Sequence, residues 1–372
     1  MLKPEYEVIL VEQHDVCSGA TGRNGGHLWP GLADSFADSV ENYGAEKTKE
    51  LFNFSMETKS YIEKFITDNN LQDDCCLDVN GSLYVATTPS EIEQLEKDFA
   101  IMKECGVLNQ TDIQLWDAEN CNKKAKGSFY GGMFTACAGQ LWPYKFVIHV
   151  LQRAIQLGVK LHSHTKITTI NKHDSGRFHL HTNNNKSFFV DRVIHATNAW
   201  ANELVPAIDN FITPIRGQVI VTEPLKERYW DIGLCLSEGY DYMIQRRDKR
   251  VVLGGRRLCS KTAEVGEMDD STLNEDISAA LRSLLGETFP DVFKDYPVNI
   301  DYEWTGIMGF TKDNIPIVDQ VNKDEFVVAG FSGHGMPMAF LCGRSVAEMA
   351  AHQKPQHFAE LMLLTEHRKM KQ

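Results

Sequence analysis

Val8-Ile-Leu-Val-Glu12 is the stretch that decides the fold, because it has the pattern of a short buried strand that ends in an acid. Shortly after it comes Cys17-Ser-Gly-Ala-Thr-Gly-Arg-Asn-Gly-Gly26, which places four glycines among small polar residues. Glycine permits positive φ and close backbone approach, and successive backbone N–H groups can then form a cradle for a ligand. The segment therefore predicts either a ligand-binding turn or a flexible surface loop, and its composition does not separate the two.

The acid at Glu12 points to nucleotide binding, although one part of the usual pattern is missing. In a dinucleotide-binding βαβ unit a glycine-rich turn follows the first strand, and an acid about 20 residues later binds the adenosine ribose. Only seven residues precede Val8, and no G-x-G-x-x-G occurs in the 372 residues. We therefore expect the sequence to begin inside such a unit, just before its second strand. A buried strand that merely ends in a polar residue is the alternative.

Five blocks of sequence together resemble one family, the D-amino-acid oxidase-like (DAO) FAD-dependent oxidoreductases. Glu12 with Ser18-Gly-Ala-Thr-Gly-Arg-Asn-Gly-Gly26 resembles its segment from the ribose-binding acid to the loop beside the flavin ring. The other four occur in the family's order and span most of the chain: Arg192-Val-Ile-His-Ala-Thr-Asn-Ala-Trp200, Pro214-Ile-Arg-Gly-Gln218, Trp304-Thr-Gly-Ile-Met-Gly-Phe-Thr-Lys-Asp-Asn-Ile-Pro-Ile317 and Ala329-Gly-Phe-Ser-Gly-His-Gly-Met336. The last two resemble loops that surround the flavin.

The resemblance implies an α/β fold with two interleaved domains. One is a three-layer, Rossmann-like FAD-binding domain, and the other is an α+β substrate domain built on an antiparallel sheet. We expect residues 1–40, 144–215 and 303–372 in the FAD-binding domain, without its first strand and glycine turn. Residues 41–143 and 216–302 are then the substrate domain.

Local patterns predict several elements without reference to the family. Residues 33–69 have a helical pattern with a break at Gly44. Thr88-Pro-Ser-Glu91 is a capping box with proline at the first helical position, so a helix should run from there to Gly106. A further helix is expected from about residue 271 to 285. Strands are expected at residues 81–86, 131–136, 159–162, 165–170, 193–197, 218–222, 240–245, 250–254 and 325–329.

Composition limits the partners and the compartment. A net charge of −13 disfavours nucleic acid and anionic membranes as main partners, and no apolar run of about 18 residues predicts a membrane span. Nine cysteines without C-x-x-C spacing fit reduced thiols and a cytoplasmic location. The alternating histidine pairs His162/His164 and His179/His181 lack a third ligand nearby, so we expect solvated strand faces and no metal.

The resemblance also implies which residues bind FAD. The backbone of Ile167 is expected at the adenine, and a covalent flavin link is left open only at His27, so non-covalent FAD is favoured. The full predicted set is Glu12, Gln13, Ser18, Gly19, Ala20, Thr21, Arg23, Asn24, Gly25, Gly26, His27, Ile167, Thr197, Trp200, Gly306, Gly330, Gly333, His334, Gly335 and Met336.

Candidate catalytic residues follow from what a flavin enzyme requires. The protein must place a substrate C–H bond against the flavin and anchor any carboxylate, for which the arginine fork is suited. Arg256, Arg257 and Arg246 are the candidate anchors, and each also has a solvated surface alternative. Tyr242 and His334 are candidates for contact with substrate. Lys312 and Asp313 could tune the cofactor or merely face water.

These observations predict a FAD-dependent oxidoreductase that oxidises a C–N bond of a small amine or amino acid to an imine. Oxygen or another acceptor would then take the electrons. One alternative is an oxidase of polyamine conjugates or N-methylated amino acids, which would differ in whether an arginine anchor lines the site. Another is a truncated, non-catalytic product of the same family. Without a central strand its neighbours would expose unpaired edges and apolar faces.

Overall fold

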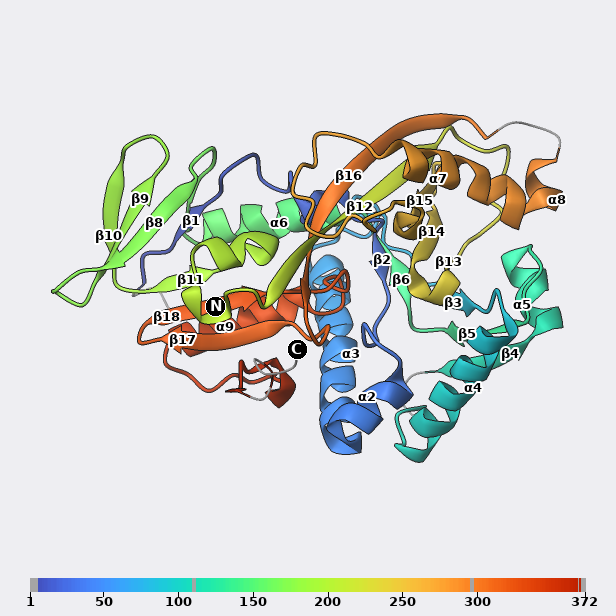
Figure 1. The fold of residues 1–372 in the computed structure, drawn as a ribbon, viewed down its shortest axis with the longest axis horizontal. Helices are drawn as coiled ribbons and strands as arrows, with labels where there is room; N and C mark the ends of the chain where they lie inside the picture. The colour runs from blue at the N-terminus through green and yellow to red at the C-terminus, as the bar shows by residue number, and fades with distance from the viewer. Residues whose placement is uncertain (1–5, 109–111, 295–297, 367, 369–372) are drawn as a thin grey trace.

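The computed structural model describes residues 6–108, 112–294, 298–366 and 368. Figure 1 shows two groups of strands, one around β18 (Glu325–Ala329) on the left and one broad sheet on the right. The long helix α3 (Ala45–Asp68) lies between them.

The broad sheet has eight strands, and all neighbours are antiparallel except β13 and β3. The helix α7 (Glu275–Thr288) covers it, and Leu281 and Leu285 of that helix share a core with Ile220 and Leu253 of the sheet. The strands lie in the order β16 (Ile300–Thr311), β12 (Ile212–Thr222), β15 (Val251–Gly254), β14 (Asp241–Gln245), β13 (Gly233–Leu236), β3 (Ser82–Val85), β5 (Gly131–Thr135) and β4 (Ile113–Asp117). This sheet matches the predicted antiparallel sheet of the substrate domain.

The second group contains a small mixed sheet of β11 (Val193–His195), β18 and β17 (Ile317–Asn322). Along β18 the side chains alternate between two cores, as the period of a strand requires. Phe326 and Val328 pack with the helix α9 (Ala339–Ala350), whereas Val327 and Ala329 pack with the 3-10 helix η2 (Asn198–Glu203) and the segment after it. The sheet is therefore covered on both faces, as predicted for a three-layer domain.

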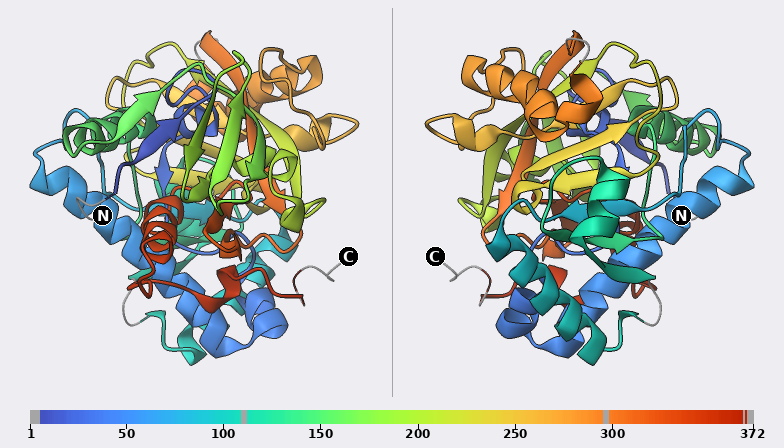
Figure 2. Two further views of the ribbon diagram at one scale, coloured as in Figure 1. Left: turned by 90° about the vertical axis from the view of Figure 1, so that its left-hand side faces the viewer. Right: turned by 90° about the vertical axis from the view of Figure 1, so that its right-hand side faces the viewer.

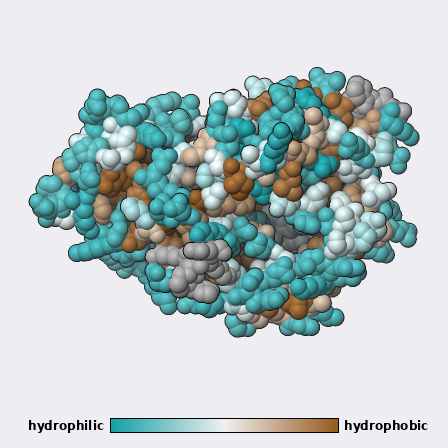
Figure 3. Space-filling view, viewed as in Figure 1, coloured by the Kyte–Doolittle hydropathy of each residue, from teal (hydrophilic) through white to brown (hydrophobic). Residues whose placement is uncertain are grey.

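Shorter sheets lie in this group and between it and the broad sheet (Figure 1). The strand β1 (Ile9–Val11) pairs in parallel only with β7 (Lys160–His162), in a sheet separate from β11. Ile9 and Leu10 of this strand are 37% and 42% exposed. Figure 3 shows brown, hydrophobic patches on this face of the molecule, set among mostly hydrophilic surface. The remaining sheets are β8 (Ile167–Lys172) with β9 (Phe178–Thr182) and β10 (Ser187–Val190), and β2 (His27–Leu28) with β6 (Gly139–Gln140).

The predicted helical signals in the first third are confirmed. The helix α2 (Phe36–Tyr43) ends at Gly44, whose φ of 81° lies in the left-handed region, and α3 begins directly after it. The helix α4 (Pro89–Glu104) has the predicted capping box between Thr88 and Glu91. Figure 2 shows α3 in blue against α9 in red, and Leu51 and Phe54 of α3 join the core around Phe326. The domain boundary after residue 40 stays a prediction.

Two local predictions need correction. Residues 304–311, expected as a loop around the flavin, form the second half of β16, which pairs with β12 along its length. The loop was implied by the family resemblance alone, and in the strand Gly306 and Gly309 face close neighbours that would crowd a side chain. The helix expected from residue 271 begins at Glu275, because the side chain of Asn274 caps it by accepting from two amides.

Two further helices are α5 (Ala118–Ala125) and α6 (Pro143–Gln156). No helix in the described part of the chain is long and apolar enough to cross a membrane.

Candidate active site

One large cavity of about 2930 Å³ lies between the two groups of strands. A pocket for a small ligand is typically about 300–1,000 Å³, so this cavity has room for a dinucleotide and a substrate together. Of the predicted cofactor-binding residues, those that line it are Glu12, Gln13, Ser18, Gly19, Ala20, Thr21, Arg23, Asn24, Gly25, Gly26, His27, Ile167, Thr197, Trp200, Gly306, Gly333, His334, Gly335 and Met336. Residues from five parts of the sequence therefore meet at one cavity.

The predicted residue that does not line the cavity is Gly330. Its φ is 75°, and a Cβ atom there would lie 2.3 Å from Thr311 Cγ2. Its amide donates a hydrogen bond to the Asn198 side chain at 2.9 Å. Gly330 thus forms a tight turn that supports the lining loop after it.

Glu12 lies at the end of β1, where backbone hydrogen bonds fix it. Its amide donates to the His162 carbonyl and its own carbonyl accepts from Thr165, both at 2.9 Å. One carboxylate oxygen accepts from the His14 amide at 2.9 Å. The strand therefore presents an acid at the cavity, and its other oxygen can accept from a hydroxyl.

The glycine-rich segment is a defined structure and not a flexible loop. Residues Ala20–Arg23 form a single helical turn, α1. A Cβ atom at Gly22 would lie 2.1 Å from the Cys17 carbonyl oxygen, and one at Gly26 would lie 2.2 Å from the Leu141 carbonyl oxygen. Side chains would clash at both positions, so glycine is required there.

Tyr242 and His27 lie against this segment, on the side of the substrate sheet. Their rings meet edge to face with centroids 5.6 Å apart. A Cβ atom at Gly25 would lie 2.7 Å from Tyr242 Cε2, and one at Gly254 would lie 2.3 Å from the Tyr242 hydroxyl oxygen. None of the described residues hydrogen-bonds that hydroxyl, which leaves it available to a ligand in the cavity.

Two of the histidines that line the cavity, His27 and His334, are neutral at physiological pH. Burial lowers the pKa of His27 to about 4, and its two ring nitrogens are buried without a hydrogen bond of ordinary geometry to any described residue. Burial likewise lowers the pKa of His334 to about 4, and His334 Nε2 lies 3.2 Å from the Gly31 carbonyl oxygen. A neutral ring that donates through Nε2 keeps Nδ1 as an acceptor.

The structure separates the three candidate arginines. Arg246 forms an ion pair with Asp248, and its guanidinium lies 4.4 Å from the Trp142 ring centroid, away from the cavity lining. Arg256 lies 3.6 Å from the carboxylate of Asp241 and does not line the cavity either.

Arg257 is the arginine of the three that lines the cavity. Its guanidinium carbon lies 4.9 Å from the ring centroid of Tyr240 and 5.1 Å from that of Phe310. No carboxylate among the described residues pairs with it. Two aromatic faces therefore hold an uncompensated cation at the cavity, where it can bind an anionic group.

Asp313 has a structural role. Its two oxygens accept from Arg368 Nε at 2.7 Å and Nη2 at 2.9 Å, and both side chains are buried. Asp313 and Lys312 do not line the cavity. No group of three or more His, Cys, Asp or Glu side chains in the described residues could hold a metal ion.

Sequence reasoning missed several lining residues. Tyr240 and Phe310 flank Arg257, and the lining also includes Trp29, Tyr84 of β3 and Met133 of β5. Phe310 was missed because its segment was interpreted as a loop. The aromatic residues carry no spacing signal that distinguishes a site from a core.

Comparison with known proteins shows the family of the chain and the proteins whose fold it shares. A family model described as "FAD dependent oxidoreductase" (DAO) matches residues 2–349. The chain is 26% identical to a probable oxidoreductase OrdL of Haemophilus influenzae, over 92% of this chain and 77% of the relative. It is 24% identical to gamma-glutamylputrescine oxidoreductase of Escherichia coli, over 92% of this chain and 78% of the relative. Among solved structures, glycine oxidase from Geobacillus kaustophilus is similar with a TM-score of 0.81 and 18% identity, covering 98% of this chain and 93% of that one.

Proposed function

The chain belongs to the DAO family of FAD-dependent oxidoreductases, and we propose from this premise that it oxidises a C–N bond in a small amine or amino acid that carries a carboxylate. The observation that carries the proposal is Arg257, an unpaired cation held by two aromatic rings at the cavity. An arginine fork binds a carboxylate with two parallel hydrogen bonds, which also orients the molecule.

The residues present fit FAD. The cavity of about 2930 Å³ exceeds the needs of a small substrate, and its lining includes the acid Glu12 and the glycines of residues 18–26 and 333–335. Glu12 would hold the adenosine ribose, Ile167 the adenine, and residues 18–27 with 333–336 the ring and ribityl chain. When bound, FAD supplies the acceptor for a hydride.

The chain's own residues orient the substrate and exclude water. Arg257 holds the carboxylate, and the rings of Tyr240 and Phe310 limit its movement. The Tyr242 hydroxyl can donate to or accept from the substrate. His27 and His334 are neutral at physiological pH, so they add no positive charge that would repel a substrate ammonium.

A second candidate substrate is a polyamine conjugate or an N-methylated amino acid. The relative named gamma-glutamylputrescine oxidoreductase supports the first of these. The volume of the cavity, whose lining also includes Trp29, Tyr84 and Met133, would give a longer molecule room. A conjugate with a terminal carboxylate could still use the same anchor.

We propose oxygen or another small acceptor as the final electron acceptor. We also propose a cytoplasmic location, because all nine cysteines are free, as expected for thiols in a reducing compartment.

The test is the visible absorption spectrum of the purified protein with FAD, recorded without oxygen while substrates are added. We expect a retained flavin spectrum that bleaches with members of a panel of D-amino acids, sarcosine and carboxylated polyamine conjugates. The matched controls are the amides of the same compounds, which lack the carboxylate and should bleach the flavin far more slowly. Equal bleaching by acid and amide would contradict the anchor, and no bleaching by any amine would contradict C–N oxidation.

A further inference from the structure

Residues 255–274, here called the cover loop, connect β15 to α7 and border the cavity. Apart from the 3-10 turn η5 (Arg257–Cys259) and an isolated antiparallel bridge between Val265 and Ile215 of β12, the loop has no regular structure. Its backbone is left-handed at Arg256, Ala263, Glu264 and Gly266. Long irregular loops in compact proteins are commonly functional. This one contributes Gly255, Arg257, Met268 and Asp270 to the cavity lining.

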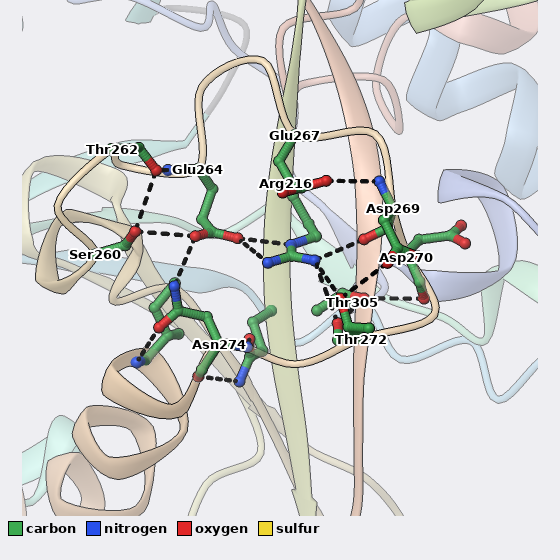
Figure 4. Close-up of polar contacts among 12 residues, drawn as sticks. Arg216, Ser260, Thr262, Glu264, Glu267, Asp269, Asp270, Thr272, Asn274 and Thr305 are labelled. Atoms are coloured by element: carbon green, nitrogen blue, oxygen red, sulfur yellow. Dashed lines mark hydrogen bonds and ion pairs between the residues drawn. The ribbon is translucent and has the colours of Figure 1, made fainter.

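Glu264 lies at the centre of the hydrogen bonds that hold the cover loop (Figure 4). One carboxylate oxygen accepts from Nε and Nη2 of Arg216 on β12, both at 2.6 Å. The other accepts from Ser260 Oγ at 2.9 Å and from Asn274 Nδ2 at 2.8 Å. One side chain therefore joins the first half of the loop, its last residue and the substrate sheet.

The Glu264 and Arg216 side chains are 5% and 7% exposed. Burial alone would raise the pKa of Glu264, but hydrogen bonds from Arg216, Ser260 and Asn274 outweigh it and hold the pKa below its usual value. Glu264 is thus ionised at neutral pH, and the pair is a charge-assisted clamp.

Arg216 also fixes the second half of the loop. Its Nη1 donates to the Asp269 carbonyl oxygen at 2.6 Å and to Thr272 Oγ1 at 2.9 Å. Its backbone amide donates to the Glu264 carbonyl oxygen at 3.1 Å. These contacts lie on both sides of Met268, so the position of Met268 in the lining depends on Arg216.

Ser260 connects Glu264 to Arg257 through two hydrogen bonds. The Ser260 amide donates to the Arg257 carbonyl oxygen at 3.1 Å, and the Ser260 hydroxyl donates to Glu264. The guanidinium of Arg257 has only aromatic faces beside it and no carboxylate partner among the described residues. Its position therefore follows from the backbone of the cover loop and not from an ion pair of its own.

We propose that Glu264, together with Arg216, is a positioning residue for substrate binding. The clamp fixes the cover loop so that Arg257 and Met268 face the cavity, and it touches neither substrate nor cofactor. The inference rests on the proposed function in that Arg257 is taken as the carboxylate anchor. Loss of the clamp should weaken substrate binding more than it slows the chemical step.

The experiment uses Glu264→Gln in the FAD-loaded protein, with two measurements. The first is cleavage by trypsin, which has sites at Arg256, Arg257 and Lys261 on the cover loop. We expect cleavage there at least about ten times faster than in the unmodified protein, because local opening exposes the loop. The second is steady-state kinetics with the best carboxylated substrate, where KM should rise about tenfold or more while kcat changes less than about threefold.

Asp313→Asn is the matched control, because it also removes a carboxylate from a buried arginine but lies outside the cover loop. It should lower overall stability without changing KM or cleavage in the loop. If Glu264→Gln does not fold, Ser260→Ala tests the same connection, since it removes one donor and keeps the pair with Arg216. A smaller change in the same two measurements is then expected.

Two results would overturn the proposal. One is unchanged cleavage of the cover loop in Glu264→Gln or Ser260→Ala, since the clamp would then not fix the loop. The other is faster cleavage with an unchanged KM, since the loop would then not position substrate-binding groups. Failure of the proposed function would be seen separately, as an unchanged KM in Arg257→Met. The cleavage measurement needs no substrate, so it tests the clamp even in that case.

Discussion

Replacing Arg257 with methionine should remove substrate binding energy at little cost to the fold. The guanidinium contacts two aromatic faces, at 4.9 and 5.1 Å from their centroids. Such contacts contribute about 0.5–1 kcal/mol each at exposed sites, and methionine regains part of this by packing on the same rings. The loss of folding stability should therefore stay below about 2 kcal/mol.

The effect on binding should be larger. A hydrogen bond to a charged group contributes about 1.5–3 kcal/mol, which corresponds to a roughly 10- to 150-fold loss in kcat/KM for a carboxylated substrate. For the amide of the same substrate the loss should be less than about threefold, because an amide forms no ion pair. The ratio of kcat/KM for acid over amide should therefore collapse towards one in the variant.

The assay is anaerobic flavin reduction followed by absorbance, with acid and amide compared in the same protein. Arg246→Met is the control, since Arg246 also lies over an aromatic ring, at 4.4 Å from the Trp142 centroid, but does not line the cavity. It should leave the acid-to-amide ratio unchanged. An Arg257→Met enzyme that still prefers the acid by the original factor would refute the reasoning.

Three further predictions concern stability and cofactor binding. Asp313→Asn leaves a buried arginine without its partner and should cost about 3–5 kcal/mol in urea unfolding, whereas a cost below about 1 kcal/mol would count against the buried pair. The pKa of His27 is about 4 when folded against 6.5 when unfolded, so the unfolded state binds more protons between these values and stability falls as pH drops through that window. Between pH 7 and 5 the loss should be about 2 kcal/mol from this residue, and equal losses in His27→Asn would exclude it as the cause. Gly25→Ala must displace the Tyr242 ring and should lower the flavin-to-protein absorbance ratio, while Gly286→Ala, where nothing lies within 4 Å of the added atom, should not.

Much of the fold could be predicted because local signals are strong at particular residues. Gly44 marks the break between two helices, and the capping box at Thr88 and Glu91 fixes the start of α4. On the cofactor side, glycines at positions 22 and 26 are required by backbone contacts that lie close by in the structure, although the composition alone left a flexible loop as an alternative. At such positions the residue type itself reflects a requirement of the backbone.

The substrate side could not be predicted in the same way. Arg256 and Arg257 are adjacent and chemically identical, and only the tertiary structure places one beside Asp241 and the other between two aromatic rings. No sequence pattern indicated a role for Glu264, because its four hydrogen-bond donors come from residues up to 48 positions away along the chain. The identity of a charged residue does not reveal whether its partner is water, a protein group or a ligand.

Arg23 links the cofactor side of the site to the substrate side by hydrogen bonds. It was expected among the cofactor-binding residues, and its segment does line the cavity, yet its guanidinium donates to protein carbonyls. Nη1 donates to the Asp270 carbonyl oxygen at 3.0 Å and to that of Thr305 at 2.7 Å. Asp270 belongs to the cover loop and Thr305 to β16, whereas Arg23 belongs to the glycine-rich segment. The cofactor segment and the substrate loop therefore form one hydrogen-bonded unit, and by linkage whatever orders one of them must favour the other by the same free energy.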